Sequence, residues 1–164
     1  EMLKERRVEY VGSMVLGLND AIIELTGTLA GLTFALQNSL LTGMAGLIMG
    51  IAASMSMAAS EYLSQKSEKR RDPLRASLYT GITYILAVLL LVAPYLVVMD
   101  YKVSLGIMFA SVILLISVFT YFVSIVKDLE FKRLFMEMFL VSLSVALISF
   151  IVGLVLRSIF NIEV

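Results

Sequence analysis

Residues 17–36 read GLNDAIIELTGTLAGLTFAL, an apolar run long enough to cross a bilayer that nevertheless carries two acids, Asp20 and Glu24. An ionised acid is costly inside a membrane, and acids found there usually face a bundle interior and line an ion or proton path. At a spacing of four residues, the two carboxylates lie one turn apart on one face of a helix. The pair predicts a small cation site within the membrane.

Composition identifies the chain as an integral membrane protein. Its 164 residues are 60% hydrophobic and 16% charged, whereas a soluble domain is about half apolar and about a quarter charged. The formal net charge is zero, which gives no indication of a nucleic-acid partner. Because the chain lacks both Cys and His, it has no thiolate or imidazole metal ligand and no Ser-His-Asp triad. We therefore predict neither an enzyme nor a resident cofactor.

Five apolar runs reach the length of about 20 residues that a membrane-spanning helix needs. They are expected at residues 11–36, 40–63, 74–98, 105–126 and 134–159, and together they form one transmembrane domain over residues 1–164. The first run is too long, and carries too many acids, for a cleavable signal peptide. The sequence predicts an all-α integral membrane protein of five helices.

Basic residues orient these spans. All but two of the 13 Lys and Arg residues fall before the first span, near the link between the second and third, or between the fourth and fifth. The exceptions are Lys102 and Arg157. Because cytoplasmic loops are enriched in Lys and Arg, this pattern places the N-terminus in the cytoplasm and the C-terminus outside.

Small residues set the first two spans apart from the other three. Gly17, Gly27, Gly31, Gly46 and Gly50 are expected to be helix-packing positions, since small residues let helix backbones approach closely in lipid. The remaining spans consist mostly of Leu, Val, Ile and Phe. We expect the first two spans to form the packed centre and the other three to face lipid.

Helical spacing places Gly17, Asp20, Glu24 and Thr28 on one side of the first span. A helix that started with Ser13 as its N-cap would put Asp20 nearer the membrane surface, but it would not explain Glu24 one turn deeper. Two adjacent carboxylates repel when both are ionised, so one is expected to hold a proton until a cation arrives. The spacing thereby favours exchange of a cation for a proton.

The second span adds Met57 and Glu61, again four residues apart. A thioether is a soft ligand that, combined with oxygen ligands, favours Fe²⁺ or a similar ion over Mg²⁺ and Ca²⁺. Met in a helix is more often a packing residue. Glu61 is explained equally well as an interfacial residue at the cytoplasmic end of its helix.

Two polar features of the later spans have local interpretations. Tyr79 and Tyr84, near the start of the third span, are interpreted as part of an interfacial aromatic belt. Glu137 follows Arg133 by four residues, and the two are expected to form an ion pair on the helix surface.

The stretches GLNDAIIELTGTLAG at residues 17–31 and GIAASMSMAASEYLSQKSE at residues 50–68 resemble the vacuolar iron transporter family. Members of this family have a Gly-hydrophobic-polar-Asp-Gly motif in the first helix. In the second helix they have a run of small residues with Ser-Met, followed by Tyr and then Lys-Ser-Glu. The two motifs together are fairly specific.

The resemblance implies a homodimer whose pathway lies between the subunits and is lined by the first two helices. It implies export of Fe²⁺, and of Mn²⁺ or other divalent metals, in exchange for protons, across the cell membrane of a prokaryote or a vacuole-type membrane of a eukaryote. Asp20 matches the family's pathway aspartate and Met57 its pathway methionine. The expected partners are the lipid bilayer, a second copy of the chain, protons and the metal ion, which is a substrate rather than a cofactor.

Three departures limit the resemblance. Ala21 stands where the family has Gly, and Met49 aligns with an acid of the plant members. The link SQKSEKRRDP at residues 64–73 is too short for the cytoplasmic metal-binding domain of plant members, so a short form is expected. Some relatives carry a ferritin-like domain before the first helix, and the sequence leaves open whether one precedes Glu1.

The leading interpretation is a divalent-metal/proton antiporter with Asp20, Glu24, Met57 and Glu61 along its ion pathway. The alternative is a non-transporting membrane protein for assembly or sensing, whose acids form a buried packing network. An intramembrane aspartate protease is disfavoured, because Asp20 and Glu24 lie on one helix and do not face each other as that chemistry requires.

Overall fold

The computed structural model describes the backbone of residues 2–69 and 72–160, and the side chains of these ranges from residue 11 onward. It contains α1 (Met2–Leu36), α2 (Ser39–Ser67), α3 (Pro73–Val97), α4 (Tyr101–Lys127) and α5 (Phe131–Phe160). All five contain a segment long and apolar enough to cross a membrane. The prediction of an all-α protein with five spans is confirmed.

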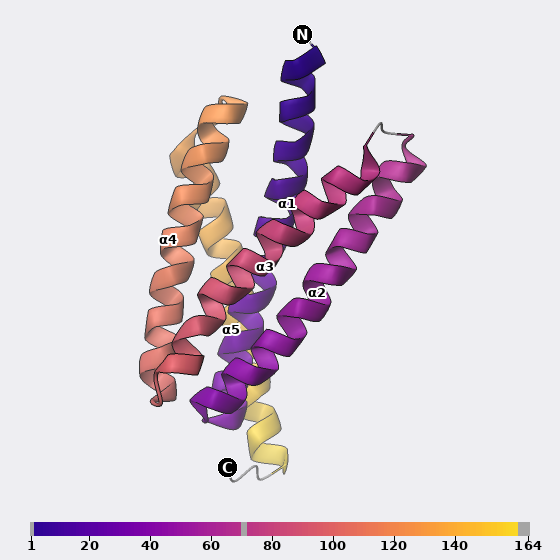
Figure 1. Cartoon of the computed structure of the whole chain (residues 1–164). Helices are drawn as coiled ribbons and strands as arrows, with labels where there is room; N and C mark the ends of the chain where they lie inside the picture. The colour runs from indigo at the N-terminus through magenta and orange to yellow at the C-terminus, as the bar shows by residue number, and fades with distance from the viewer. Residues whose placement is uncertain (1, 70–71, 161–164) are drawn as a thin grey trace.

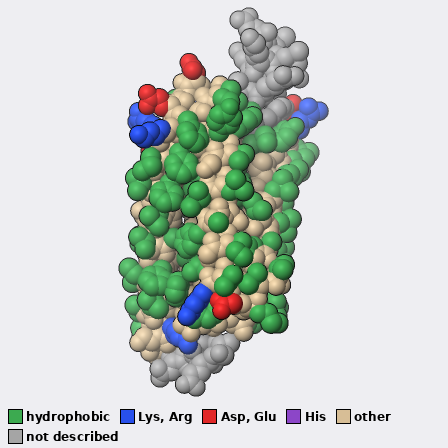
Figure 2. Space-filling view, turned by 90° about the vertical axis from the view of Figure 1, so that its left-hand side faces the viewer, with side chains coloured by type: hydrophobic (Ala, Val, Ile, Leu, Met, Phe, Trp, Pro, Cys, Tyr) green, Lys and Arg blue, Asp and Glu red, His purple; other side chains and the backbone are tan. Residues whose placement is uncertain are grey.

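The helices form one elongated bundle, in which α1 starts at one end and α5 finishes at the other (Figure 1). Figure 2 shows hydrophobic side chains over the middle of one face and charged side chains near its two ends. This distribution suits a bilayer, because apolar side chains then meet lipid tails and charges meet water. The direction of insertion stays a prediction. Among the basic residues that support it, the side chains of Lys4, Arg6 and Arg7, and the whole of Arg70 and Arg71, lie outside the described residues.

Short capped links connect successive helices. Gln37, with a φ of 49°, turns the chain after α1. The Asn38 side chain then caps α2 by accepting a hydrogen bond from the Leu41 N–H at 3.0 Å. Asp100 caps the start of α4 in the same way. Because these links are short, each helix runs back alongside its predecessor, so α1, α3 and α5 share one direction.

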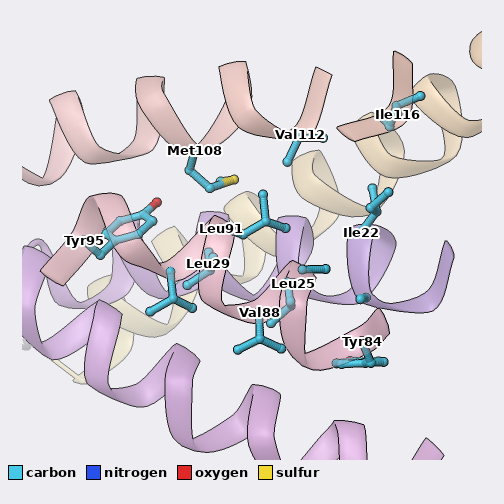
Figure 3. Packing of buried hydrophobic residues seen from close by; sticks show 13 residues of the cluster. Ile22, Leu25, Leu29, Tyr84, Val88, Leu91, Tyr95, Met108, Val112 and Ile116 are labelled. Atoms are coloured by element: carbon cyan, nitrogen blue, oxygen red, sulfur yellow. The ribbon is translucent and has the colours of Figure 1, made fainter. Parts of the chain in front are cut away.

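The core lies between α1, α3 and α4 (Figure 3). Its members include Ile22, Leu25 and Leu29 of α1, Tyr84, Val88, Leu91 and Tyr95 of α3, and Met108, Val112 and Ile116 of α4. The expectation that the first two spans form the packed centre while the other three face lipid is therefore wrong: α3 and α4 supply buried members of this core, whereas α2 supplies only partly buried ones. Lipid tails are as apolar as Leu, so hydropathy does not distinguish a helix that faces lipid from one that faces other helices.

Glycines bring neighbouring helices into backbone contact. A methyl group at Gly17 would overlap the carbonyl oxygen of Thr80 in α3, and one at Gly153 of α5 would overlap that of Gly31. The other three expected packing glycines also meet neighbouring helices: Gly27 meets Val145 of α5, Gly46 meets Leu29 of α1, and Gly50 meets Val88 of α3. The glycines of α1 therefore pack against α3 and α5, not against α2.

Candidate functional site

One face of α1 carries a line of polar side chains: Ser13, Asp20, Glu24 and Thr28. Asp20 and Thr28 are half-buried and Glu24 is exposed, and we call these three residues the α1 stripe. Because α1 begins well before Ser13, the alternative in which the helix starts with Ser13 as its N-cap is excluded. Asp20 lies about 13 Å along the helix from Val11, where the apolar segment starts. The stripe is thus inside the membrane-spanning part of α1.

The exposed acid of the stripe is held by a tyrosine from the core. The Tyr84 hydroxyl donates to Oε2 of Glu24 at 2.6 Å, and the Tyr84 side chain is fully buried. The interpretation of Tyr84 as part of an aromatic belt is therefore wrong. The position of Tyr84 in the sequence could have excluded the aromatic belt. Tyr84 lies roughly 16 Å along α3 from Pro73, which is too deep in the membrane for an interfacial ring.

Glu61 lies in a second polar cluster, between α1 and α2. Its side chain is only 7% exposed, and its Oε1 accepts hydrogen bonds from Ser13 Oγ at 2.7 Å and Gln65 Nε2 at 2.9 Å. Thr80 of α3 donates to the Ser13 carbonyl oxygen at 3.0 Å. Glu61 is thus a buried, hydrogen-bonded acid less than two turns before the end of α2 at Ser67. Sequence reasoning missed Ser13 as a partner of Glu61, because that contact depends on how α1 and α2 are rotated about their axes.

The three acids among the four predicted pathway residues, Asp20, Glu24 and Glu61, do not form one metal-binding group within the described part of the chain. Asp20 and Glu24 are neighbours on the α1 stripe, whereas Glu61 belongs to the cluster with Ser13. Met57 is half-buried and packs against the hydrophobic core. Among the described residues, no three Asp, Glu, His or Cys side chains are grouped so that they could hold a metal ion. The α1 stripe offers two carboxylates, which is fewer donors than a divalent transition ion usually takes.

A hollow of about 260 Å³ opens between α1, α2 and α5. Its walls include Thr28 and Gly31 of α1, Met49 of α2 and Ser149 of α5. Because Thr28 belongs to the α1 stripe and also lines the hollow, the stripe extends from its two acids to this hollow. Met49 contributes a neutral thioether side chain to the wall of the hollow.

Comparison with known proteins identifies the segment that carries the stripe. A model of the VIT family matches residues 11–72, which contain Asp20, Glu24, Met57 and Glu61. Vacuolar iron transporter homolog 4 of Arabidopsis thaliana is 26% identical over 136 residues, covering 70% of this chain and 67% of that protein. The resemblance to the vacuolar iron transporter family is confirmed.

The segment that matches the VIT family model ends in the link between α2 and α3. That link is short, since α2 ends at Ser67 and α3 begins at Pro73. Ala21, which stands where the family has Gly, is fully buried in the core. With five membrane-length helices and this family match, the chain is a multi-pass membrane protein.

Proposed function

We propose that this protein exports divalent transition metal ions, Fe²⁺ or Mn²⁺, from the cytoplasm in exchange for protons. The family assignment supports metal-ion transport, and the Arabidopsis relative is named as a vacuolar iron transporter homolog. The observation that carries the proposal is the Glu24 carboxylate, which is exposed on a membrane-spanning helix one turn from Asp20. Acids at such depth are costly, and they commonly mark an ion path.

The α1 stripe supplies oxygen ligands to the metal ion, which is the transported substrate. A divalent ion that binds Asp20 and Glu24 displaces the proton that their mutual repulsion retains. When the ion leaves on the far side, a proton returns to the pair, so metal and protons cross in opposite directions. The Met57 thioether adds a soft ligand, which favours Fe²⁺ over Mg²⁺ and Ca²⁺.

The proposed functional unit is a homodimer. The outer face of α2 leaves small side chains exposed, namely Ala52, Ser56, Ala59 and Ser60. Small residues at such a position allow close helix approach in lipid. A second copy that covers this face and the α1 stripe would add its own carboxylates. It would thereby complete a metal site for which the described residues of one chain hold too few acids.

Flux into proteoliposomes tests this function. Purified protein is reconstituted with a pH-sensitive dye inside the vesicles, and anaerobic Fe²⁺ uptake is measured under an imposed pH gradient. Wild type should take up Fe²⁺ while protons move the other way, and Asp20→Asn should lose most of both signals. Glu137→Gln is the control, because Glu137 pairs with Arg133 on the exposed helix surface, as the sequence predicted.

Two outcomes would count against the proposal. If well-folded wild type moves none of iron, manganese or cobalt, the chain is not a transporter by itself, and an assembly or sensing role becomes the better interpretation. If Asp20→Asn transports as well as wild type, the path does not run along the α1 stripe.

A further inference from the structure

Two buried tyrosines of α3 reach α1 in parallel ways. Tyr84 donates to Glu24 Oε2 at 2.6 Å, and the Tyr95 hydroxyl lies 2.8 Å from Thr33 Oγ1. Both rings are buried in the core that α1, α3 and α4 share, as Figure 3 shows. The two residues therefore have the same packing role, but only the Tyr84 hydroxyl forms its hydrogen bond with an ionisable group, the Glu24 carboxylate.

The contact between Tyr84 and Glu24 joins a fixed group to a mobile one. The Tyr84 ring is fully buried among core side chains, so the place of its hydroxyl is set by packing. Glu24 is exposed, and without a partner its flexible side chain would sample several rotamers. The length of 2.6 Å falls in the range of hydrogen bonds from hydroxyl groups to carboxylates. Tyr84 thus fixes one oxygen of Glu24 and leaves Oε1 for another ligand.

We propose that Tyr84 is a positioning residue of the metal path: by holding Oε2 of Glu24, it presents Oε1 to a divalent ion that passes along the α1 stripe. This inference rests on the proposed function. In metal sites generally, carboxylate ligands are themselves held by hydrogen bonds, and removal of such a partner lowers metal affinity by about 10- to 100-fold. The metal itself does not contact Tyr84.

A comparison of four proteins tests the proposal: wild type, Tyr84→Phe, Tyr95→Phe and Glu24→Gln. Mn²⁺ binding is measured in detergent from the electron paramagnetic resonance signal of the free ion, and Mn²⁺ flux is measured in proteoliposomes. Tyr84→Phe should raise both the dissociation constant and KM about tenfold, with Vmax little changed. Tyr95→Phe removes the same hydroxyl from the same helix, so it should leave binding and KM as in wild type.

The double variant Tyr84→Phe/Glu24→Gln separates positioning from packing. If Tyr84 acts through the carboxylate, the double variant should bind Mn²⁺ no more weakly than Glu24→Gln alone. The proposal is overturned if Tyr84→Phe binds and transports like wild type, if Tyr95→Phe causes the same loss, or if the two changes of the double variant add independently.

The proposed function can fail separately. Wild type that neither binds nor transports Mn²⁺ or Fe²⁺ would overturn the proposed function, and with it the role of Tyr84. Wild type that binds and transports, beside an unaffected Tyr84→Phe, would overturn only the role of Tyr84.

Discussion

The Tyr84 hydroxyl lies 2.6 Å from Oε2 of Glu24, so a fully buried ring of α3 supports an exposed acid of α1. The VIT family match ends at residue 72, before α3 begins. The acids of the α1 stripe therefore lie in the matched segment, while the support of Glu24 lies outside it. Since Gly17 also meets the backbone of Thr80, α3 places the stripe through packing as well as through a hydrogen bond.

The close contact between Gly17 and Thr80 predicts a strong dependence on glycine size. A methyl group at Gly17 would overlap a backbone carbonyl, whereas one at Gly12, in the same helix, would meet nothing within 4 Å. Gly17→Ala should destabilise the protein by about 1–3 kcal/mol through overpacking. Gly12→Ala should be neutral or stabilising by up to about 1 kcal/mol, because Ala favours helix. Thermal unfolding in detergent compares the two, and equal stability of both variants would contradict the close contact.

The buried position of Glu61 predicts that its acceptor oxygens matter more for stability than its charge. Glu61→Ala leaves the donors Ser13 and Gln65 without their acceptor, at a cost of about 1–3 kcal/mol. Glu61→Gln keeps an acceptor oxygen and should cost less. The control is Glu137→Ala, which breaks the ion pair with Arg133 and should cost only about 0.2–1 kcal/mol, since both side chains are exposed.

Unfolding midpoints of the Glu61 and Glu137 variants, measured in one detergent, test whether the acceptor oxygens of Glu61 stabilise the protein. A Glu61→Ala variant as stable as Glu137→Ala would mean that the cluster around Glu61 does not hold α1 and α2 together. If Glu61→Gln is stable but loses metal flux, Glu61 serves the ion path in addition to its structural contacts.

The absence of cysteine from the sequence allows a direct test of the proposed dimer. Single cysteines at Ala52, Ser56 or Ala59 would lie on the outer face of α2, and at least one should form a disulfide-linked dimer on mild oxidation of the membrane. A disulfide requires Cα atoms within about 7 Å, so it reports close approach of two copies. Ser144→Cys, on the exposed side of α5, is the matched control. Equal cross-linking at Ser144, or none on α2, would contradict the proposed interface.

The sequence was sufficient to place the helices, because apolar length and turn residues are local properties. The predicted span at residues 74–98 corresponds to α3 at Pro73–Val97, and the run at residues 134–159 falls within α5 at Phe131–Phe160. The pair Asp20 and Glu24 was recognisable for the same reason, since four residues make about one helical turn.

Contacts between helices could not be predicted from the sequence. The bond from Tyr84 to Glu24 and the bond from Ser13 to Glu61 each depend on the rotation of two helices about their axes. Hydropathy carries little information on that rotation, because lipid and protein interior are both apolar. As a result, Tyr84 was interpreted as interfacial, and the contact of Ser13 with Glu61 was not predicted.

The last prediction separates two roles for Met57, which packs against the core and is also a candidate soft ligand. Met57→Leu nearly conserves side-chain volume and should cost less than about 1.5 kcal/mol of stability. Met108→Leu is the control, because Met108 is fully buried in the same core and far less able to meet an ion. If the Met57 thioether binds the metal, Met57→Leu should reduce Fe²⁺ flux more than Mn²⁺ flux, since Mn²⁺ has less need of a soft ligand. Competition between the two ions in one proteoliposome preparation measures that ratio. A ratio equal to that of Met108→Leu and wild type would leave Met57 as a packing residue only.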